Sequence, residues 1–577
     1  MFSVDQVVSQ HFPKLNNKPW LRKPLTYFLR RLLHEQEFID FEQQYPHLSG
    51  YDFVEKVLDY FDFSYRTTDR EIARIPVTGK VVIIANHPIG SLDGLALLQL
   101  LQRIRPDVKV VANELLMSIK PLRPTLLPVN NMNGLTVKDN LQNIHNHLQS
   151  EGALIIFPAG EVSRLRPTGI KDTKWNSGFL RIASRAQAPI LPIHIQARNS
   201  ALFYGTSMLY KPLATMLLVK EMFKQNANTV KMTVGKMVPY DSYQGPQLSK
   251  SAKVRLFQKQ TYRVAKGKNG YFRTESPIAH PENRVVLKQA IEQCEALGFT
   301  PDNKHIYLYR HSGSSAILRE LGRLRELAFR AVGEGTGTKR DIDHYDSDYL
   351  HLVLWDPDDL EIAGAYRFAE AKKCLQQAAD TGLYSQTLFQ YQNEMAPYFE
   401  QGLELGRSFV QPKYWGRRSL DYLWLGIGAF IAKHPEYRYL FGPVSISDKL
   451  PKNAKDLLIY FYQLYFSAPQ TLATANVPYL VDKNLPESLG VEFVGNDYKK
   501  DFTTLKTVLD NMGTAVPTLY KQYSEVCDFG GVQFLDFGVD PDFNNCIDGL
   551  VLVDLNQLKA NKRSRYIDSH VSQTTVA

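Results

Sequence analysis

A histidine and an aspartate stand six residues apart in the stretch VVIIANHPIGSLDGLALLQL, residues 81–100. His87 follows a short apolar run, and Asp93 precedes a second one. An imidazole that a carboxylate holds in one tautomer is suited to take a proton from a hydroxyl group near neutral pH. The pair therefore predicts a general base with an orienting carboxylate.

The surrounding sequence indicates how this pair would be positioned. Residues 81–85 are β-branched and predict a buried strand, whereas the leucine-rich residues 95–100 predict a helix. Asp93 stands where a helix N-cap is common, so a purely structural role remains an alternative for it. That alternative gives no packing reason for His87.

Composition narrows the class of protein. The chain has 577 residues, a net charge of +9 and only four cysteines, which are far apart. This favours anionic partners and a reducing compartment, and it suggests no zinc site. No secretory signal and no membrane-spanning run is apparent, so we expect a cytoplasmic protein. Charge alone is weak evidence for nucleic-acid binding, and no base-stacking motif supports it.

The segment KLNNKPWLRKPLTYFLRRLL, residues 14–33, mixes cations with aromatic and leucine side chains. This pattern is typical of a helix that lies at a membrane interface and faces acidic lipids. An ordinary amphipathic surface helix, packed on its own domain, is the alternative. The first interpretation predicts a peripheral protein on the inner face of a bacterial cytoplasmic membrane.

Two further strand-ending blocks, IIFPAGEVSRL at residues 155–165 and APILPIHI at residues 188–195, follow the His-Asp block. In this order the three blocks resemble the glycerolipid acyltransferase family. The resemblance implies that His87 activates an acceptor hydroxyl toward an acyl thioester, that Asp93 orients the imidazole, and that Glu161 contacts substrate. The stretch LLPVNNMNG, residues 126–134, stands where many relatives have a phosphate-gripping arginine, which makes a phosphate-bearing acceptor less expected.

A second set of chemistry-bearing residues lies in the C-terminal half, in the segments LGRLRELAF, RDIDHYDSDYLHLVLW, IAGAYRF and LELGRSFV. In order they resemble the N-acyltransferases that make lyso-ornithine lipid, whose fold is similar to acetyltransferases and acyl-homoserine lactone synthases. The resemblance implies that Glu404 is catalytic. It also implies a substrate-binding set: Arg325, Phe329, Asp343, Asp346, Arg367 and Arg407.

The turn QPKYWGRRSLDYLW, residues 411–424, leads into a predicted helix. Gly416 and the following backbone amides could receive the phosphate of a phosphopantetheine arm, as helix N-termini do. Arg417 and Arg418 could instead meet acidic residues of a carrier protein. We expect no cofactor of the protein itself, because the donor is a thioester on acyl carrier protein or possibly on coenzyme A.

These features predict an α/β protein with two acyltransferase domains. The N-terminal one is a glycerolipid acyltransferase-like α/β domain, and the C-terminal one is a GNAT-like domain with a mixed sheet. The predicted ranges are 1–60 for basic membrane-docking helices, 61–272 for the O-acyltransferase domain, 273–284 for a linker, 285–560 for the N-acyltransferase domain and 561–577 for a disordered basic tail.

Together the two resemblances imply a bifunctional ornithine lipid synthase. The C-terminal domain would join a 3-hydroxyacyl group to the α-amine of ornithine, and the N-terminal domain would acylate the 3-hydroxyl of the resulting lyso-ornithine lipid. Two alternatives remain open. One is a lysophospholipid acyltransferase fused to an N-acyl amino acid synthase of other specificity, and the other is a non-catalytic lipid-binding protein.

Overall fold

The computed structural model divides the chain into two compact units, 1–277 and 278–577. The division falls inside the stretch 273–284 that the sequence predicts as a linker. The described residues are 26–27, 30–31, 34–90, 92–112, 114–117, 119–129, 137–166, 169–209, 211–376, 382–482, 485–488, 490–491 and 493–570.

The first unit is built on a seven-stranded sheet of order β1-β9-β8-β2-β5-β3-β4. All neighbours pair in parallel except β8 and β9, so β1 and β9 run against the rest. The strands are β1 Ser64–Arg66, β2 Val81–Ala85, β3 Val108–Ala112, β4 Leu126–Pro128, β5 Ala153–Ile156, β8 Ile190–Gln196 and β9 Thr229–Val234. A separate hairpin joins β6 Arg164–Arg166 to β7 Gly169–Lys171.

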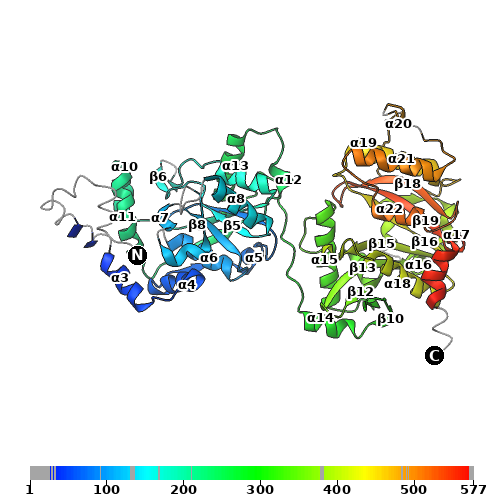
Figure 1. Cartoon of the computed structure of the whole chain (residues 1–577), viewed down its shortest axis with the longest axis horizontal. Coiled ribbons are helices and arrows are strands. Elements are labelled where there is room, and N and C mark those ends of the chain that lie inside the picture. Colours follow the sequence, from blue (N-terminus) through cyan, green and yellow to red (C-terminus); the bar gives the residue numbers. More distant parts are fainter. Residues whose placement is uncertain are drawn as a thin grey trace. The chain divides into compact units, whose positions relative to one another are not determined.

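Helices cover both faces of this sheet (Figure 1). Alternate side chains of β2 divide between two cores: Val81 and Ile83 pack with α4 and α6, whereas Val82 and Ile84 pack with α8, α9 and α13. Burial on both faces explains the unbroken apolar run of this strand. The helices are α3 Glu35–Gln44, α4 Gly50–Tyr60, α5 Asp69–Ile72, α6 Leu92–Gln102, α7 Glu114–Met117, α8 Val137–Gln149, α9 Gly178–Ala186, α10 Ala201–Leu209, α11 Lys211–Phe223, α12 Tyr240–Tyr243 and α13 Lys250–Val264, with a 3₁₀ helix at η2 Lys120–Thr125.

The structure corrects one part of the predicted docking region. Helices α3 and α4 bury Phe41, Val54 and Leu58 in the core of the first unit. Their apolar faces are therefore used for packing within the unit, and residues 34–60 belong to its fold. Most of the basic segment 14–33 lies outside the described residues.

The second unit holds an eight-stranded sheet of order β10-β11-β12-β13-β15-β16-β19-β18. Neighbours are antiparallel except β15 and β16, which are parallel. The strands are β10 Glu295–Phe299, β11 His305–Arg310, β12 Leu350–Asp356, β13 Glu361–Glu370, β15 Gly402–Val410, β16 Tyr439–Ile446, β18 Val532–Asp540 and β19 Cys546–Asp554, with a small second sheet of β14 Phe389–Tyr391 and β17 Ala473–Ala475.

Helices pack on both faces of this second sheet as well. One core joins the sheet to α18, α19, α21 and α22, and the other joins it to α14 and α15. The longer helices are α14 Arg284–Ile291, α15 Ala316–Val332, α18 Ser419–Lys433, α19 Lys452–Phe466, α21 Tyr498–Asn511 and α22 Thr518–Ser524. Short helices lie at η3 His344–Ser347, α16 Ala371–Gln376, η4 Tyr384–Thr387, η5 Asn393–Met395, α17 Ala396–Glu400, η6 Pro412–Tyr414, α20 Leu485–Ser488, η7 Leu555–Gln557, α23 Ala560–Arg563 and η8 Ser564–Asp568.

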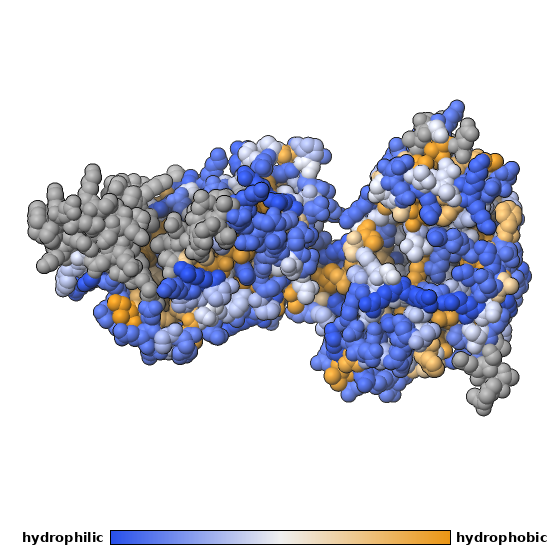
Figure 2. Space-filling view, in the orientation of Figure 1, coloured by the Kyte–Doolittle hydropathy of each residue, from blue (hydrophilic) through white to orange (hydrophobic). Residues whose placement is uncertain are grey.

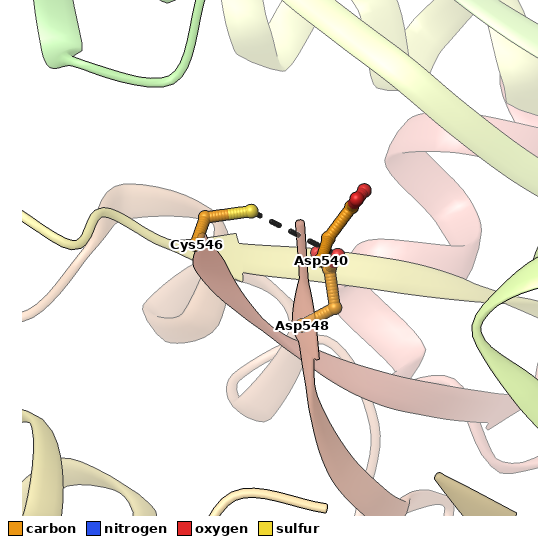
Figure 3. A group of neighbouring side chains, drawn as sticks. All are labelled: Asp540, Cys546 and Asp548. Carbon is orange, nitrogen blue, oxygen red and sulfur yellow. Dashed lines mark hydrogen bonds between the residues drawn. The ribbon is translucent and has the colours of Figure 1, made fainter. Parts of the chain in front are cut away.

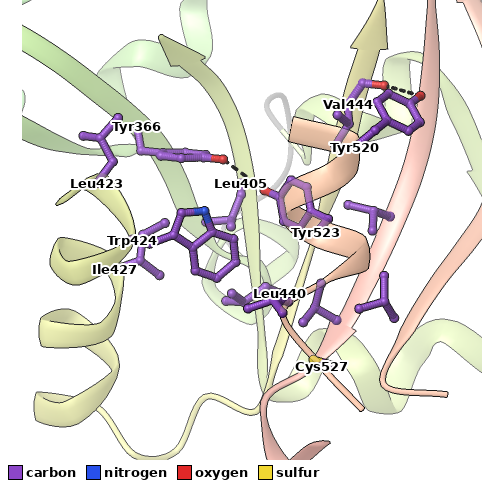
Figure 4. Close-up of a cluster of buried hydrophobic side chains, with 14 of the residues drawn as sticks. Tyr366, Leu405, Leu423, Trp424, Ile427, Leu440, Val444, Tyr520, Tyr523 and Cys527 are labelled. Atoms are coloured by element: carbon purple, nitrogen blue, oxygen red, sulfur yellow. Dashed lines mark hydrogen bonds between the residues drawn. The ribbon is translucent and has the colours of Figure 1, made fainter. Parts of the chain in front are cut away.

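Figure 4 shows the larger core, in which three tyrosine hydroxyls find partners inside an apolar cluster. The hydroxyls of Tyr366 and Tyr523 lie 3.1 Å apart, and Tyr520 donates a 2.8 Å hydrogen bond to the carbonyl of Val444. Buried phenols need such partners to avoid a desolvation cost. The second unit is thereby fixed around β16, one of the strands that border the site described below.

The predicted disordered tail is wrong for residues 561–570. This part of the chain forms α23 and η8 and packs on α18, where the Tyr566 hydroxyl donates a 2.7 Å hydrogen bond to Asp421. Tyr566 and Ile567 are hydrophobic residues inside this basic segment, and both are buried in the core, where Tyr566 lies beside Gly428. Their burial favours an ordered segment. Residues 571–577 lie outside the described residues.

Hydrophilic residues predominate on the visible surface of each unit, and hydrophobic residues form scattered patches there (Figure 2). Among the described helices, none is both long enough and apolar enough to span a bilayer.

Candidate active sites

His87 and Asp93 lie where the sequence places them, between the end of β2 and the first turn of α6. The Nδ1 of His87 is 3.2 Å from a carboxylate oxygen of Asp93. Asp93 is fully buried, and its carboxylate also accepts hydrogen bonds from the backbone amides of Ile89, Gly90 and Gly94. The turn thus fixes the carboxylate, and the carboxylate fixes the ring.

This arrangement changes the acidity of both groups. Burial alone would lower the pKa of His87, but the negative charges of Asp93 and Asp172 outweigh it and raise that pKa. Burial would raise the pKa of Asp93, but the charge of His87 and the hydrogen bonds from the imidazole and amides hold it below its usual range. Asp93 therefore stays ionised at neutral pH, and it contacts Nδ1 rather than Nε2 of the His87 ring.

Other residues of the three blocks, and one residue between the second and third blocks, contact His87 or the end of β2. Asn86 exchanges two 2.8 Å hydrogen bonds with the backbone of Ile195, which ties the end of β2 to β8. Phe157 stacks on the His87 ring with centroids 4.3 Å apart. Asp172 accepts hydrogen bonds from the His87 amide at 3.3 Å and from the Ser163 hydroxyl at 2.5 Å. The imidazole is thus held by Asp93 and Phe157, and the backbone of His87 is held by Asp172.

Glu161 has a more peripheral place. Its carboxylate is 3.3 Å from Arg164, which in turn donates to the hydroxyl of Ser207. The Glu161 side chain is one-third exposed, at 33%. From the same FPAGE block, it is Phe157 and not Glu161 that contacts the imidazole.

In the second unit, several of the singled-out residues form one buried charge network. Arg325 donates to Asp346 at 2.6 Å, and Arg367 donates to Asp346 at 3.1 Å and to Asp343 at 2.5 Å. Arg325, Arg367 and Asp346 are each 1% exposed. His351 lies beside Arg325, and burial together with that positive charge lowers its pKa to about 3, so it is neutral. The network packs between α15 and the sheet and holds η3 in place.

Glu404 lies at a different point from Arg407, although both are on β15. Glu404 is 1% exposed and accepts hydrogen bonds from the Tyr349 hydroxyl and from the amides of Tyr384 and Ser385. Glu404 does not line the cavity described next. Its observed contacts are therefore those of a residue that anchors η4.

A cavity of about 660 Å³ opens where β15 and β16 separate. The two parallel strands pair only over residues 402–404 and 439–441, and the later halves of both strands line the cavity. Arg407 lies at this point in a left-handed conformation, with φ of +47°. It contacts Asp341 at 3.1 Å and donates to the Tyr384 hydroxyl at 3.0 Å. A strained residue beside a gap in the sheet is typical of a functional site.

The cavity has an apolar part and a part that faces a helix N-terminus. Phe329 contributes to its apolar wall, together with Val332, Phe409, Leu450 and Leu519. Trp415, Gly416 and Arg417, which precede α18, contribute to the other part. Gly416 has φ of +74° and open space where a Cβ would stand. Arg418 is exposed and lies outside the lining. An acyl chain and a phosphorylated arm could each find a suitable surface here.

Three carboxyl groups that the sequence-based reasoning missed also line this cavity: Glu334, Asp540 and Asp548. The sequence did contain a signal for Asp548, which is an acidic residue inside the otherwise apolar stretch CIDGLVLV, residues 546–553. Asp540, Cys546 and Asp548 are close neighbours at the β18–β19 hairpin (Figure 3). Burial, followed by the negative charge of Asp548, strongly raises the pKa of the Cys546 thiol.

Two protein families match the chain. The acyltransferase family matches residues 8–269, and the acetyltransferase (GNAT) domain matches residues 324–425. These matches confirm the predicted fold class and the predicted class of enzyme. They also account for the two units, since each family covers a part of one of them.

Curated relatives match separate parts of the chain. The glycine N(alpha)-acyltransferase of Phocaeicola vulgatus is 30% identical over 311 residues, which cover 51% of this chain and 94% of that protein. The lyso-glycine lipid O-acyltransferase of Bacteroides thetaiotaomicron is 30% identical over 250 residues, 42% of this chain and 90% of that protein. The L-ornithine N(alpha)-acyltransferase of Agrobacterium fabrum is 32% identical over 117 residues, 19% of this chain and 39% of that protein. The chain therefore belongs to the acyltransferases, and it joins a unit of the acyltransferase family to a unit of the GNAT family.

Proposed function

We propose that this chain makes a diacylated amino-acid lipid in two steps. The second unit joins an acyl group from a thioester to the α-amine of an amino acid, and the first unit esterifies a hydroxyl of that acyl chain with a second acyl group. The observation that carries the proposal is the pairing of an N-acyltransferase relative with a lyso-lipid O-acyltransferase relative, each matching about half of one chain.

In the O-acylation step, His87 acts as the base. Its Nε2 takes the proton from the acceptor hydroxyl while the oxygen attacks the thioester carbonyl, and the imidazolium then protonates the leaving thiolate. Asp93 keeps Nδ1 protonated and stabilises the charged ring, because their atoms are 3.2 Å apart. Such a positioned base accelerates proton transfer by roughly 10²–10⁴-fold.

In the N-acylation step, the gap between β15 and β16 admits the thioester arm. The helix N-terminus after Gly416 favours a phosphate, and the exposed Arg417 and Arg418 suit an acidic acyl carrier protein. Arg407 lines the same cavity and supplies a positive charge for the carboxylate of the amino acid. Coenzyme A is the alternative donor.

For the acceptor we propose glycine. The sequence-based prediction named ornithine, and the ornithine relative is similar over a much shorter part of its length than the glycine relative. Ornithine remains the second candidate because the cavity holds three carboxyl groups, which could also meet a side-chain ammonium.

Lipid analysis of a bacterial host that lacks aminolipids tests this proposal. Expression of the full chain should yield a diacylated N-acyl glycine, identified by mass spectrometry with labelled glycine and labelled ornithine in separate cultures. His87→Ala should remove the diacyl product and leave the monoacyl amide. His145→Ala, on the partly exposed side of α8, is the matched control and should leave the diacyl product unchanged. A chain that yields neither amino-acid lipid would contradict the proposal.

A further inference from the structure

The three carboxyl groups that line the cavity come from separate elements. Glu334 follows α15, Asp540 ends β18, and Asp548 lies in β19. Asp548 is opposite Ser445 of β16 on one side and Gly538 of β18 on the other. Its carboxyl group therefore comes from the hairpin end of β19, opposite the part of β16 that is not paired with β15.

Two of these groups already have structural partners. Asp540 accepts hydrogen bonds from the amides of Asp542 and Phe543, at 2.9 and 3.1 Å, and so closes the β18–β19 turn. Glu334 accepts a 2.9 Å hydrogen bond from the Ser445 hydroxyl. These contacts hold the two carboxyl groups as part of the cavity wall.

Asp548 differs from both. It is 6% exposed, and among the described residues its carboxylate has one recorded hydrogen-bond partner, the thiol of Cys546 at 3.9 Å (Figure 3). A thiol at that distance is a weak donor. A carboxyl group that is almost fully buried, weakly partnered and next to a cavity is placed to receive a substrate group.

The surroundings of Asp548 also set its proton affinity. Burial, followed by the negative charges of Asp540 and Glu334, raises the pKa of Asp548 to about 8, while Arg407 and the Cys546 hydrogen bond oppose this rise. The Tyr520 phenol lies on the other side, and burial keeps it protonated. A carboxyl group with this pKa accepts and releases a proton near neutral pH.

We propose that Asp548 binds the ammonium group of the acceptor amino acid and removes its proton for N-acylation. This inference rests on the proposed function of the second unit. The ammonium gives a proton to Asp548, and the free amine attacks the thioester carbonyl. The C–N bond forms, the C–S bond breaks, and the thiolate leaves with the second nitrogen proton. Asp548 then returns its proton to water, so the balance is one amide, one thiol and one proton.

The test uses the full chain and an assay of amide formation from an acyl carrier protein thioester and glycine. Asp548→Asn keeps the shape of the side chain and should lower the rate at pH 7 by roughly 10²–10⁴-fold. The wild-type rate should rise with pH and level off near pH 8. In the variant, the deficit relative to the wild type should shrink as pH rises toward 9, because more acceptor then arrives as free amine.

The control is Asp542→Asn, an exposed carboxylate of the same turn, which should leave rate and pH profile unchanged. Near-ultraviolet circular dichroism of each variant reports whether the second unit stays folded, and Asp548→Glu supplies a second variant that keeps the carboxyl group and should restore part of the rate. If the wild type acylates glycine and Asp548→Asn matches it within about threefold with the same pH profile, the role of Asp548 is refuted while the proposed function stands. If the wild type acylates no amino acid, the proposed function fails and this inference fails with it.

Discussion

The buried charge network of the second unit gives a stability prediction with a magnitude. Asp346 is 1% exposed, and its carboxylate accepts hydrogen bonds from Arg325 at 2.6 Å, from Arg367 at 3.1 Å and from the Asp343 amide at 2.9 Å. Asp346→Ala removes all three. Within the described part of the chain, it leaves Arg325 buried with the neutral His351 ring as its one neighbouring acceptor.

The expected loss is about 3–5 kcal/mol in the free energy of unfolding, the usual cost of removing one partner from a buried ion pair. A second route gives a similar value, since a hydrogen bond between charged groups contributes about 1.5–3 kcal/mol and two arginines are affected. Asp346→Asn keeps an acceptor oxygen but removes the charge, so its loss should be smaller. Asp348→Ala, an exposed neighbour, should change stability by at most about 0.5 kcal/mol.

Urea denaturation of the full chain measures these losses, and hydrogen exchange of peptides from α15 assigns the transition to the second unit.

The same network makes the stability depend on pH. Burial would raise the pKa of Asp346, but the charges of Arg325 and Arg367 hold it well below its ordinary value. The contribution of Asp346 is therefore complete above the unfolded pKa of about 3.9 and is lost as pH falls toward the lower, folded pKa. A loss below about 1 kcal/mol for Asp346→Ala at pH 7 would refute this reasoning, because it would mean that both guanidinium groups find other partners.

Three further predictions concern the two sites and the packing of η8. Asp93→Asn should lower the O-acylation rate and move the acid limb of its pH profile downward, because the carboxylate is what raises the pKa of His87; an unchanged profile would argue against the pair. The double variant Arg417→Glu, Arg418→Glu should raise the KM for a donor on acyl carrier protein while sparing kcat, and an equal effect on a coenzyme A donor would point away from carrier docking. Gly428→Val should destabilise the second unit, since an added Cβ would lie 1.8 Å from the backbone oxygen of Tyr566 in η8; thermal unfolding that matches the wild type would show that η8 is not held there.

Local patterns in the sequence were sufficient to predict that His87 and Asp93 lie together. His87 and Asp93 are six residues apart, and a strand followed by a tight turn and a helix brings them together whatever the rest of the chain does. The apolar strands β2 and β5 are equally easy to predict from the sequence, because burial on both faces gives an unbroken apolar run. The short edge strands β1 and β4, with three residues each, carry too little pattern to be predicted.

The second site depends on contacts between distant segments, and there the sequence was a poorer guide. The motif residues Arg325, Asp346 and Arg367 do come together, as a buried network that braces the fold. Glu404 is held by η4, whereas Asp548, which no motif marked, lines the cavity. The difference arises from the pairing of β16 with β19, which spans about a hundred residues of chain and has no local signature.

The two proposed bases are tuned toward neutral pH in opposite ways. His87 starts as a weak base, and added carboxylates strengthen it by stabilising its charged form. Asp548 starts as a much weaker base, and burial beside two other carboxyl groups strengthens it by penalising its charged form. Both bases lose activity when they are protonated, so acidification should slow amide formation and ester formation together. A chain that performs the steps in sequence would then reduce its output as pH falls without accumulating the monoacyl intermediate, whereas inactivation of His87 alone would accumulate it.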